Sequence, residues 1–127
     1  MSKEVDLLSP SVLCFVGDAV YGLFVRTALS RINRPSGEHH RISVKLVNAA
    51  AQAEGFKIIE PLLDEKETAV FKRGRNFHTS SAPKSATKAQ YHAATGLEAL
   101  FGYLYLSGNN ERAQELFDKI WESSGLQ

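Results

Sequence analysis

Residues 9–29 read SPSVLCFVGDAVYGLFVRTAL, and this stretch decides the fold because it carries the signals of one long helix. Ser9 can cap the helix, and Pro10 stands at the first helical position, where the missing amide hydrogen costs little. Apolar residues follow through Leu29, which predicts a helix of about 20 residues. Asp18 interrupts this helix, with apolar or small residues three and four positions away on either side. We therefore expect its carboxylate on or beside an apolar face, not on a solvent-exposed face.

Helix signals also dominate the rest of the chain, and no sustained alternation of apolar and polar residues predicts a strand. Capping residues predict four further helices, which begin near Ser36, Asp64, Thr87 and Asn110. We expect the first of them to run to Gly55, the second to Gly74, and the third to Ser107–Gly108. The sequence therefore predicts a single all-α domain of five to six or more helices over residues 1–127.

The composition is that of a globular intracellular domain. The chain has 127 residues, of which 43% are hydrophobic and 23% charged. Its one cysteine, Cys14, excludes an intramolecular disulfide and the four-cysteine zinc sites, so a reducing, cytoplasmic setting fits best. We expect no signal peptide in the N-terminal MSKEVDLLSPS and no membrane-spanning segment. A net charge of +1 is too small to indicate a polyanion-binding protein, so any basic surface must be local.

Glu98 is a second carboxylate that stands among apolar residues, as Asp18 does. Glu98 lies inside the apolar run GLEALFGYLYL, residues 96–106, and neither acid has a lysine or arginine three or four positions away. Because an unpartnered carboxylate in low dielectric is costly, each acid needs a partner from elsewhere in the fold. Two packed helices could bring both acids to one Mg²⁺, which is typically held by one or two carboxylates plus phosphates. The alternative is a structural role, with Arg26 or Arg75 as the partner.

Four glycines interrupt the same two predicted helices, at Gly17, Gly22, Gly96 and Gly102. Each costs about 1 kcal/mol relative to alanine inside a helix, so each needs a reason. Two reasons remain open. The glycines allow a close approach of helices within a tight core, or they allow a close approach of two subunits.

Residues 72–88 read KRGRNFHTSSAPKSATK and contain five lysines and arginines but no acid. A loop of about a dozen residues without structure of its own is uncommon unless it is functional. Basic side chains and loop amides are groups that contact phosphate, and a loop can enter a groove that a helix cannot. The RNA-binding candidates are therefore Lys72, Arg73, Arg75, Asn76, Lys84 and Lys88. The alternative is a solvated charged loop. A second basic run, residues 26–45, is a further place where phosphate could bind.

Two motifs together resemble a known family. LCFVGDAVYGLFVR, residues 13–26, resembles the signature helix of the ribonuclease III family, and TGLEALFGYLYLSG, residues 95–108, resembles its second acidic motif. The chain length and RGRN, residues 73–76, followed by a loop and then YHAATGLEAL, are similar to the Mini branch of that family, which lacks a double-stranded-RNA-binding domain. The resemblance covers nearly the whole chain, and the pair of motifs is far more specific than either alone.

The resemblance implies roles for both acids. Asp18 would be the catalytic aspartate of the GDAV motif, and Glu98 the magnesium-binding glutamate of the EAL motif. The expected protein is an all-α homodimer whose signature helices and glycines meet across a two-fold axis. Its expected activity is Mg²⁺-dependent cleavage of double-stranded RNA, leaving 5′-phosphate and 3′-hydroxyl ends, in the maturation of ribosomal RNA, the 23S precursor.

The chain also departs from the family pattern. Full-length members carry further acids where this chain has Ser11, Cys14 and Thr95, so we expect a thinner site that holds one ion with Asp18 and Glu98. Two other interpretations remain open at this point. One is a non-catalytic helical RNA-binding or scaffold domain of the same fold, and the other is a structural dimer whose acids are satisfied by arginines.

Overall fold

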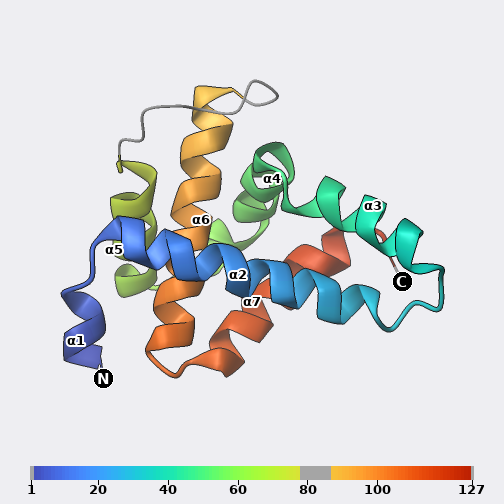
Figure 1. Cartoon of the computed structure of the whole chain (residues 1–127). Coiled ribbons are helices and arrows are strands. Elements are labelled where there is room, and N and C mark those ends of the chain that lie inside the picture. Colours follow the sequence, from blue (N-terminus) through green and yellow to red (C-terminus); the bar gives the residue numbers. More distant parts are fainter. Residues whose placement is uncertain (1, 78–86, 127) are drawn as a thin grey trace.

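The computed structural model describes residues 2–77 and 87–126, and within these ranges it holds seven α-helices, one short 3₁₀ helix and no strand (Figure 1). The helices are α1 (Ser2–Asp6), α2 (Pro10–Leu29), α3 (Ser36–Val47), α4 (Ala49–Ile59), η1 (Glu60–Leu62), α5 (Glu65–Arg75), α6 (Lys88–Leu106) and α7 (Asn110–Ser123). The predicted all-α class is confirmed. The short helix α1 is an element that the sequence did not predict.

Helix α6 is the centre of the fold. Helix α2 crosses in front of it, and α5 and α4 flank it on either side (Figure 1). The apolar residues of the EAL motif region form the core, since Leu97, Leu100 and Phe101 are 0% exposed. The ring of Tyr21 on α2 packs edge-on against Phe101, with 5.2 Å between the ring centroids. The two motif helices are therefore each other's main packing partners.

Glycines allow α2 and α6 to touch backbone to backbone. A Cβ atom placed on Gly17 would lie 1.6 Å from the carbonyl oxygen of Glu98, and one on Gly102 would lie 2.0 Å from the carbonyl oxygen of Leu13. A Cβ atom placed on Gly96 would likewise lie 2.5 Å from the ring of Phe71 on α5. Close approach within one chain accounts for these three glycines, so the subunit-contact alternative is not needed for them.

Local capping explains where most helices begin. The side chains of Ser9, Asp64 and Thr87 each accept a hydrogen bond from a backbone amide of the following helix, as expected. The prediction of one helix from Ser36 to Gly55 was wrong, because Asn48 interrupts it. The backbone of Asn48 is extended, with φ −73° and ψ 163°, and its side chain accepts the Ala51 amide at 2.8 Å to start α4.

Helix α2 carries more apolar surface than the core of this chain uses. By length and composition alone it is the one helix in the described ranges that could cross a membrane, but the buried helices of globular cores pass the same test, so the expectation of no membrane-spanning segment is not contradicted. Part of α2 is buried against α6, but Phe15 remains 81% exposed, Leu23 64% and Val12 42%. A large apolar face of α2 is therefore uncovered in the single chain.

Candidate active site

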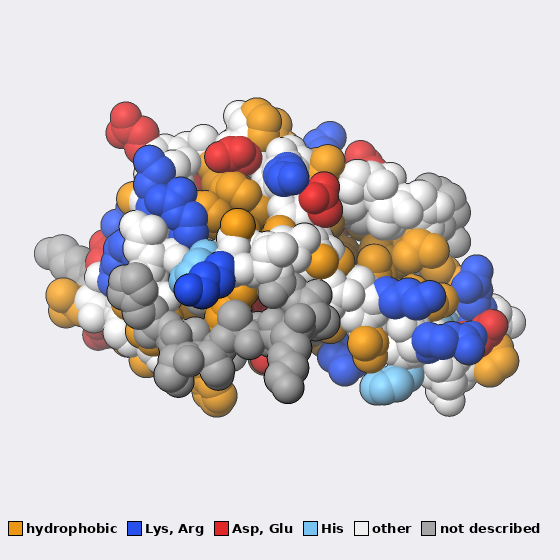
Figure 2. Space-filling model, turned by 90° about the horizontal axis from the view of Figure 1, so that it is seen from above, with side chains coloured by type: hydrophobic (Ala, Val, Ile, Leu, Met, Phe, Trp, Pro, Cys, Tyr) orange, Lys and Arg blue, Asp and Glu red, His pale blue; other side chains and the backbone are white. Residues whose placement is uncertain are grey.

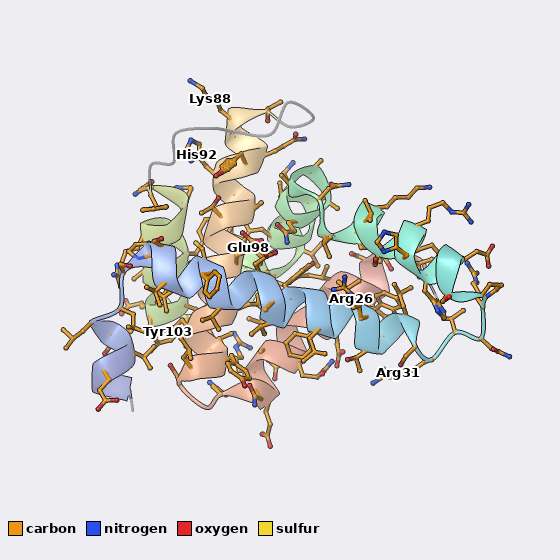
Figure 3. All side chains as sticks on the ribbon, viewed as in Figure 1. Arg26, Arg31, Lys88, His92, Glu98 and Tyr103 are labelled. Carbon is orange, nitrogen blue, oxygen red and sulfur yellow. The ribbon has the colours of Figure 1, made fainter. Side chains whose placement is uncertain are left out.

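The crossing of α2 and α6 brings the two predicted acids together. Because Gly17 contacts the backbone of Glu98, the next residue of α2, Asp18, lies beside the Glu98 side chain. Their carboxyl groups are within hydrogen-bonding reach of each other. Figure 3 shows Glu98 on the flank of α6 between α2 and α4. Glu98 is half-buried, whereas Asp18 is exposed, so the expectation that Asp18 avoids the solvent face was wrong.

The electrostatics of the pair favour a cation. Burial, the charge of Asp18 and the hydrogen bond between the two acids raise the pKa of Glu98 to about 8, although a hydrogen bond from Gln52 opposes the rise. A shift in this direction means that the second negative charge is strongly disfavoured beside the first. A positive ion between the two carboxylates would relieve this repulsion.

No arginine fills that place within the described residues. The Nε of Arg75 donates to Asn76 at 3.2 Å, and neither Arg26 nor Arg75 forms an ion pair there with Asp18 or Glu98. The ion pairs of the described chain lie elsewhere, for example between Arg112 and Glu67 at 2.8 Å. The described residues therefore give no support to the arginine-satisfied alternative.

The donor set fits a single hard divalent ion. Residues 2–77 and 87–126 contain no group of three or more histidine, cysteine, aspartate or glutamate side chains that could hold a metal, so Asp18 and Glu98 stand as a pair. Mg²⁺ keeps several waters and is usually held by one or two carboxylates plus substrate phosphates. Two adjacent carboxylates at a surface suit that ion, and they leave room for a phosphate to complete its shell.

A cavity of about 300 Å³ adjoins Glu98 between α4 and α6. Its lining residues are Val47, Asn48, Ala49, Gln52, Tyr91, Ala94, Thr95 and Glu98. Gln52 is 2% exposed, and its amide donates to Glu98. Gln52 is a residue of the site that the sequence did not predict. The one sequence feature that could have identified Gln52 is that it is an amide side chain inside the alanine-rich stretch that begins α4.

Two of the three positions at which acids are absent, Cys14 and Thr95, carry neutral groups with hydrogen-bond partners. The thiol of Cys14 donates to the carbonyl oxygen of Thr95 at 3.2 Å, and the Thr95 hydroxyl donates to the carbonyl oxygen of Tyr91 at 2.8 Å. Burial and the nearby charge of Glu98 raise the pKa of Cys14 to about 12, despite a backbone hydrogen bond from Ala99 that lowers it. A pKa shift in this direction makes the partly buried Cys14 thiol unreactive near neutral pH.

The basic candidates gather at one end of the molecule. Lys72, Arg73, Arg75 and Asn76 are exposed at the end of α5, and Lys88 is exposed at the start of α6. Lys84 lies outside the described residues. Figure 2 shows lysine and arginine side chains over this end, and a second group over α3, where Arg41 and Lys45 are exposed. Some of this charge has a structural partner, since Arg73 donates to the carbonyl oxygen of Leu8 at 3.0 Å.

Comparison with known proteins assigns the class. Residues 11–109 match the Ribonuclease III domain, so the chain belongs to the ribonuclease III family and is an endoribonuclease. An X-ray structure of a protein from Fusobacterium nucleatum has the same fold, with a TM-score of 0.84 and 29% identity over 93% of this chain and 95% of that one.

Within the family, the chain groups with the proteins named Mini-ribonuclease 3. It is 46% identical to the Mini-ribonuclease 3 of Thermoanaerobacter sp. (strain X514) over 120 residues, which cover 93% of this chain and 84% of the relative. It is 45% identical to that of Symbiobacterium thermophilum over 114 residues, which cover 86% and 85%. The resemblance inferred from the GDAV and EAL motifs is confirmed.

Proposed function

We propose that the protein is a Mg²⁺-dependent endonuclease that cuts double-stranded RNA at Asp18 and Glu98. The observation that carries this proposal is the placement of two carboxylates side by side, from α2 and α6, without a basic partner among the described residues. Such a pair is unfavourable by itself but suits a divalent cation.

Asp18 and Glu98 have different proposed roles in the site. Asp18 is exposed, so its carboxylate can meet both the ion and the RNA, whereas Glu98 is half-buried and held from behind by Gln52. When bound, Mg²⁺ would supply the charge that polarises the scissile phosphate and activates water for in-line attack. The proposed products carry 5′-phosphate and 3′-hydroxyl ends.

The exposed face of α2 supports a homodimer. Phe15, Ala19 and Leu23 follow one another at intervals of four residues, so they form one stripe, and Phe15 and Leu23 are exposed by 81% and 64%. An apolar stripe of this kind is typical of a surface that another chain covers. A two-fold dimer formed through α2 would present two acid pairs, one for each strand of a duplex.

The basic surface supports binding of an RNA duplex. A-form RNA is recognised mainly through its phosphates, its 2′-hydroxyls and its shape. We propose that Lys72, Arg73, Arg75, Asn76, Lys84 and Lys88 contact the RNA backbone. The charged side chains of the described part of this segment are all exposed. On the strength of the family resemblance, we propose precursor 23S ribosomal RNA in the cytoplasm as the substrate.

Cleavage of a labelled RNA duplex tests the proposal. Wild-type protein should cut the duplex in Mg²⁺ but not in EDTA, and it should leave the single-stranded control intact. Asp18→Asn should bind the duplex with unchanged affinity and fail to cut it. Binding without cutting by the wild type, over a range of divalent ions and duplex sequences, would instead favour the non-catalytic RNA-binding domain.

A further inference from the structure

Gln52 is a buried polar side chain whose partner belongs to the acid pair. Four polar or charged residues of the described chain are buried to less than 9% exposure: Ser43, Gln52, Glu67 and Thr95. The hydroxyls of Ser43 and Thr95 donate to carbonyl oxygens of their own helices, and Glu67 pairs with Arg112. The hydrogen bonds and the ion pair of these three side chains stabilise the fold. Gln52 differs, because it lines one cavity with Glu98 and its amide lowers the pKa of the Glu98 carboxyl group.

Gln52 lies where its amide can orient the Glu98 side chain. Gln52 reaches from α4 and Asp18 from α2, and both contact the one Glu98 side chain on α6. The cavity of about 300 Å³ is lined by both Gln52 and Glu98, so Glu98 has room to rotate if the amide no longer holds it. The backbone contact between Gly17 and Glu98 fixes the helices but leaves the Glu98 side chain free to turn.

We propose that Gln52 is a positioning residue for RNA cleavage, which holds the Glu98 carboxylate toward Asp18 so that the two acids can share one divalent ion. The inference rests on the proposed Mg²⁺-dependent function. Groups that orient metal ligands through hydrogen bonds are part of a metal site, and their removal typically costs about 10–100-fold in metal affinity or activity. A neutral amide orients Glu98 without adding a third negative charge to the pair.

The neutrality of Gln52 has a further consequence. With two carboxylates in the described site, the ion must take its remaining ligands from water and from the RNA phosphate. Binding of the ion to the RNA-free protein is therefore weak, and RNA strengthens it. A carboxylate at position 52 would add a third anionic ligand, which should tighten binding of the ion before RNA arrives.

Two variants of opposite expected effect test this role. Gln52→Met keeps the volume but removes the amide, and Gln52→Glu keeps the shape but adds a charge. The probe is Mn²⁺, whose binding to the RNA-free protein is measured by electron paramagnetic resonance. We expect Gln52→Met to lower Mn²⁺ affinity and Mg²⁺-dependent cleavage by about 10–100-fold, whereas Gln52→Glu raises Mn²⁺ affinity. Affinity for duplex RNA in EDTA, where no ion couples the acid pair to the RNA phosphate, should stay at the wild-type value for Gln52→Met.

A matched control lies on α7, where the amide of Gln114 donates to Asp118 at 2.7 Å. Gln114→Met breaks a similar amide–carboxylate bond and should leave Mn²⁺ binding and cleavage unchanged. If Gln52→Met does not fold, Gln52→Glu still tests the inference, because its expected effect is an increase in Mn²⁺ affinity, which an unfolded protein would not show. Wild-type Mn²⁺ affinity in the folded Gln52→Met protein, or no tighter binding in Gln52→Glu, would overturn the inference. A wild type that cuts no duplex would overturn the proposed function, yet the Mn²⁺ measurement would still decide on Gln52.

Discussion

Replacement of Gly17 by alanine should damage both the fold and the site, because Gly17 is where α2 and α6 touch. The new Cβ would lie 1.6 Å from the carbonyl oxygen and 2.5 Å from the carbonyl carbon of Glu98. Non-bonded carbon contacts are comfortable at about 3.5–4.0 Å, so the two helices must separate locally by about 2 Å. Backbone atoms cannot rotate aside as a flexible side chain can.

The expected magnitude follows from that displacement. Overpacking of a core usually costs about 1–3 kcal/mol, and a clash with backbone belongs at or beyond the upper end, so we expect a loss of at least about 3 kcal/mol in the free energy of unfolding. For a domain of this size that loss corresponds to a fall of roughly 10 °C in Tm. Since Asp18 moves with Gly17, the acid pair should also separate. A misplacement of about 1 Å can cost about 100-fold in rate.

Urea and thermal unfolding at one fixed protein concentration measure the effect, because the stability of a dimer depends on concentration. Gly37→Ala is the matched control, since a Cβ at Gly37 in the first turn of α3 meets no atom within 4 Å. That change should be neutral or should stabilise by about 0.5 kcal/mol, through the lower entropy of the unfolded chain. A Gly17→Ala protein with the wild-type unfolding free energy, to within about 1 kcal/mol, would refute the packing argument.

Three further predictions concern RNA, assembly and pH. Replacing Arg73 and Arg75 together by alanine should weaken duplex binding. It should also reduce the slope of log affinity against log salt by about 1 for each phosphate that the two arginines neutralise. An unchanged slope would mean that the RNA binds elsewhere on the protein. If the proposed dimer forms through α2, Phe15→Lys should convert it to a species near 14.0 kDa in light scattering, whereas a wild type that is already monomeric at all concentrations would contradict the α2 interface. Burial alone would raise the pKa of Glu67, but hydrogen bonds from Arg112 and from the backbone of Asp64 bring the pKa below its ordinary value of 4.5. The stability that the Glu67–Arg112 ion pair contributes should therefore be fully present above pH 4.5 and should be lost as the pH falls through the lowered pKa of Glu67. The free energy of unfolding of Glu67→Gln should not show this decrease at low pH.

Local chemistry is what the sequence predicted well. A helix cap depends on a side chain and an amide within three residues, so Ser9, Asp64 and Thr87 could be identified from their neighbours. Asn48 uses the same chemistry but was missed, because apolar spacing continues on both sides of it and no glycine or proline marks the break.

Tertiary relationships were harder to predict. Helical spacing placed Asp18 beside an apolar face, but it could not show that α6 covers Gly17 and leaves Asp18 exposed. The pairing of Asp18 with Glu98 came from the mutual need of two unpartnered acids and from the family motifs. Gln52 offered neither signal, because an amide both donates and accepts and so does not require one kind of partner, and helical spacing did not show that this side chain is buried.

The fold holds the acid pair together against its own repulsion. Burial first, and then the charge of Asp18, raise the pKa of Glu98, so a second negative charge is disfavoured there and the chain must supply a constraint that keeps the two carboxyl groups side by side. The contact of Gly17 with the Glu98 backbone supplies this constraint, because it belongs to the main helix crossing of the core and cannot relax without moving α2. The packing of the core thus holds two carboxyl groups side by side, and in the proposed function a bound cation would compensate their charge. In the proposed function such a site would need few ligands of its own, because a bound cation would compensate the second charge that burial and Asp18 disfavour on Glu98.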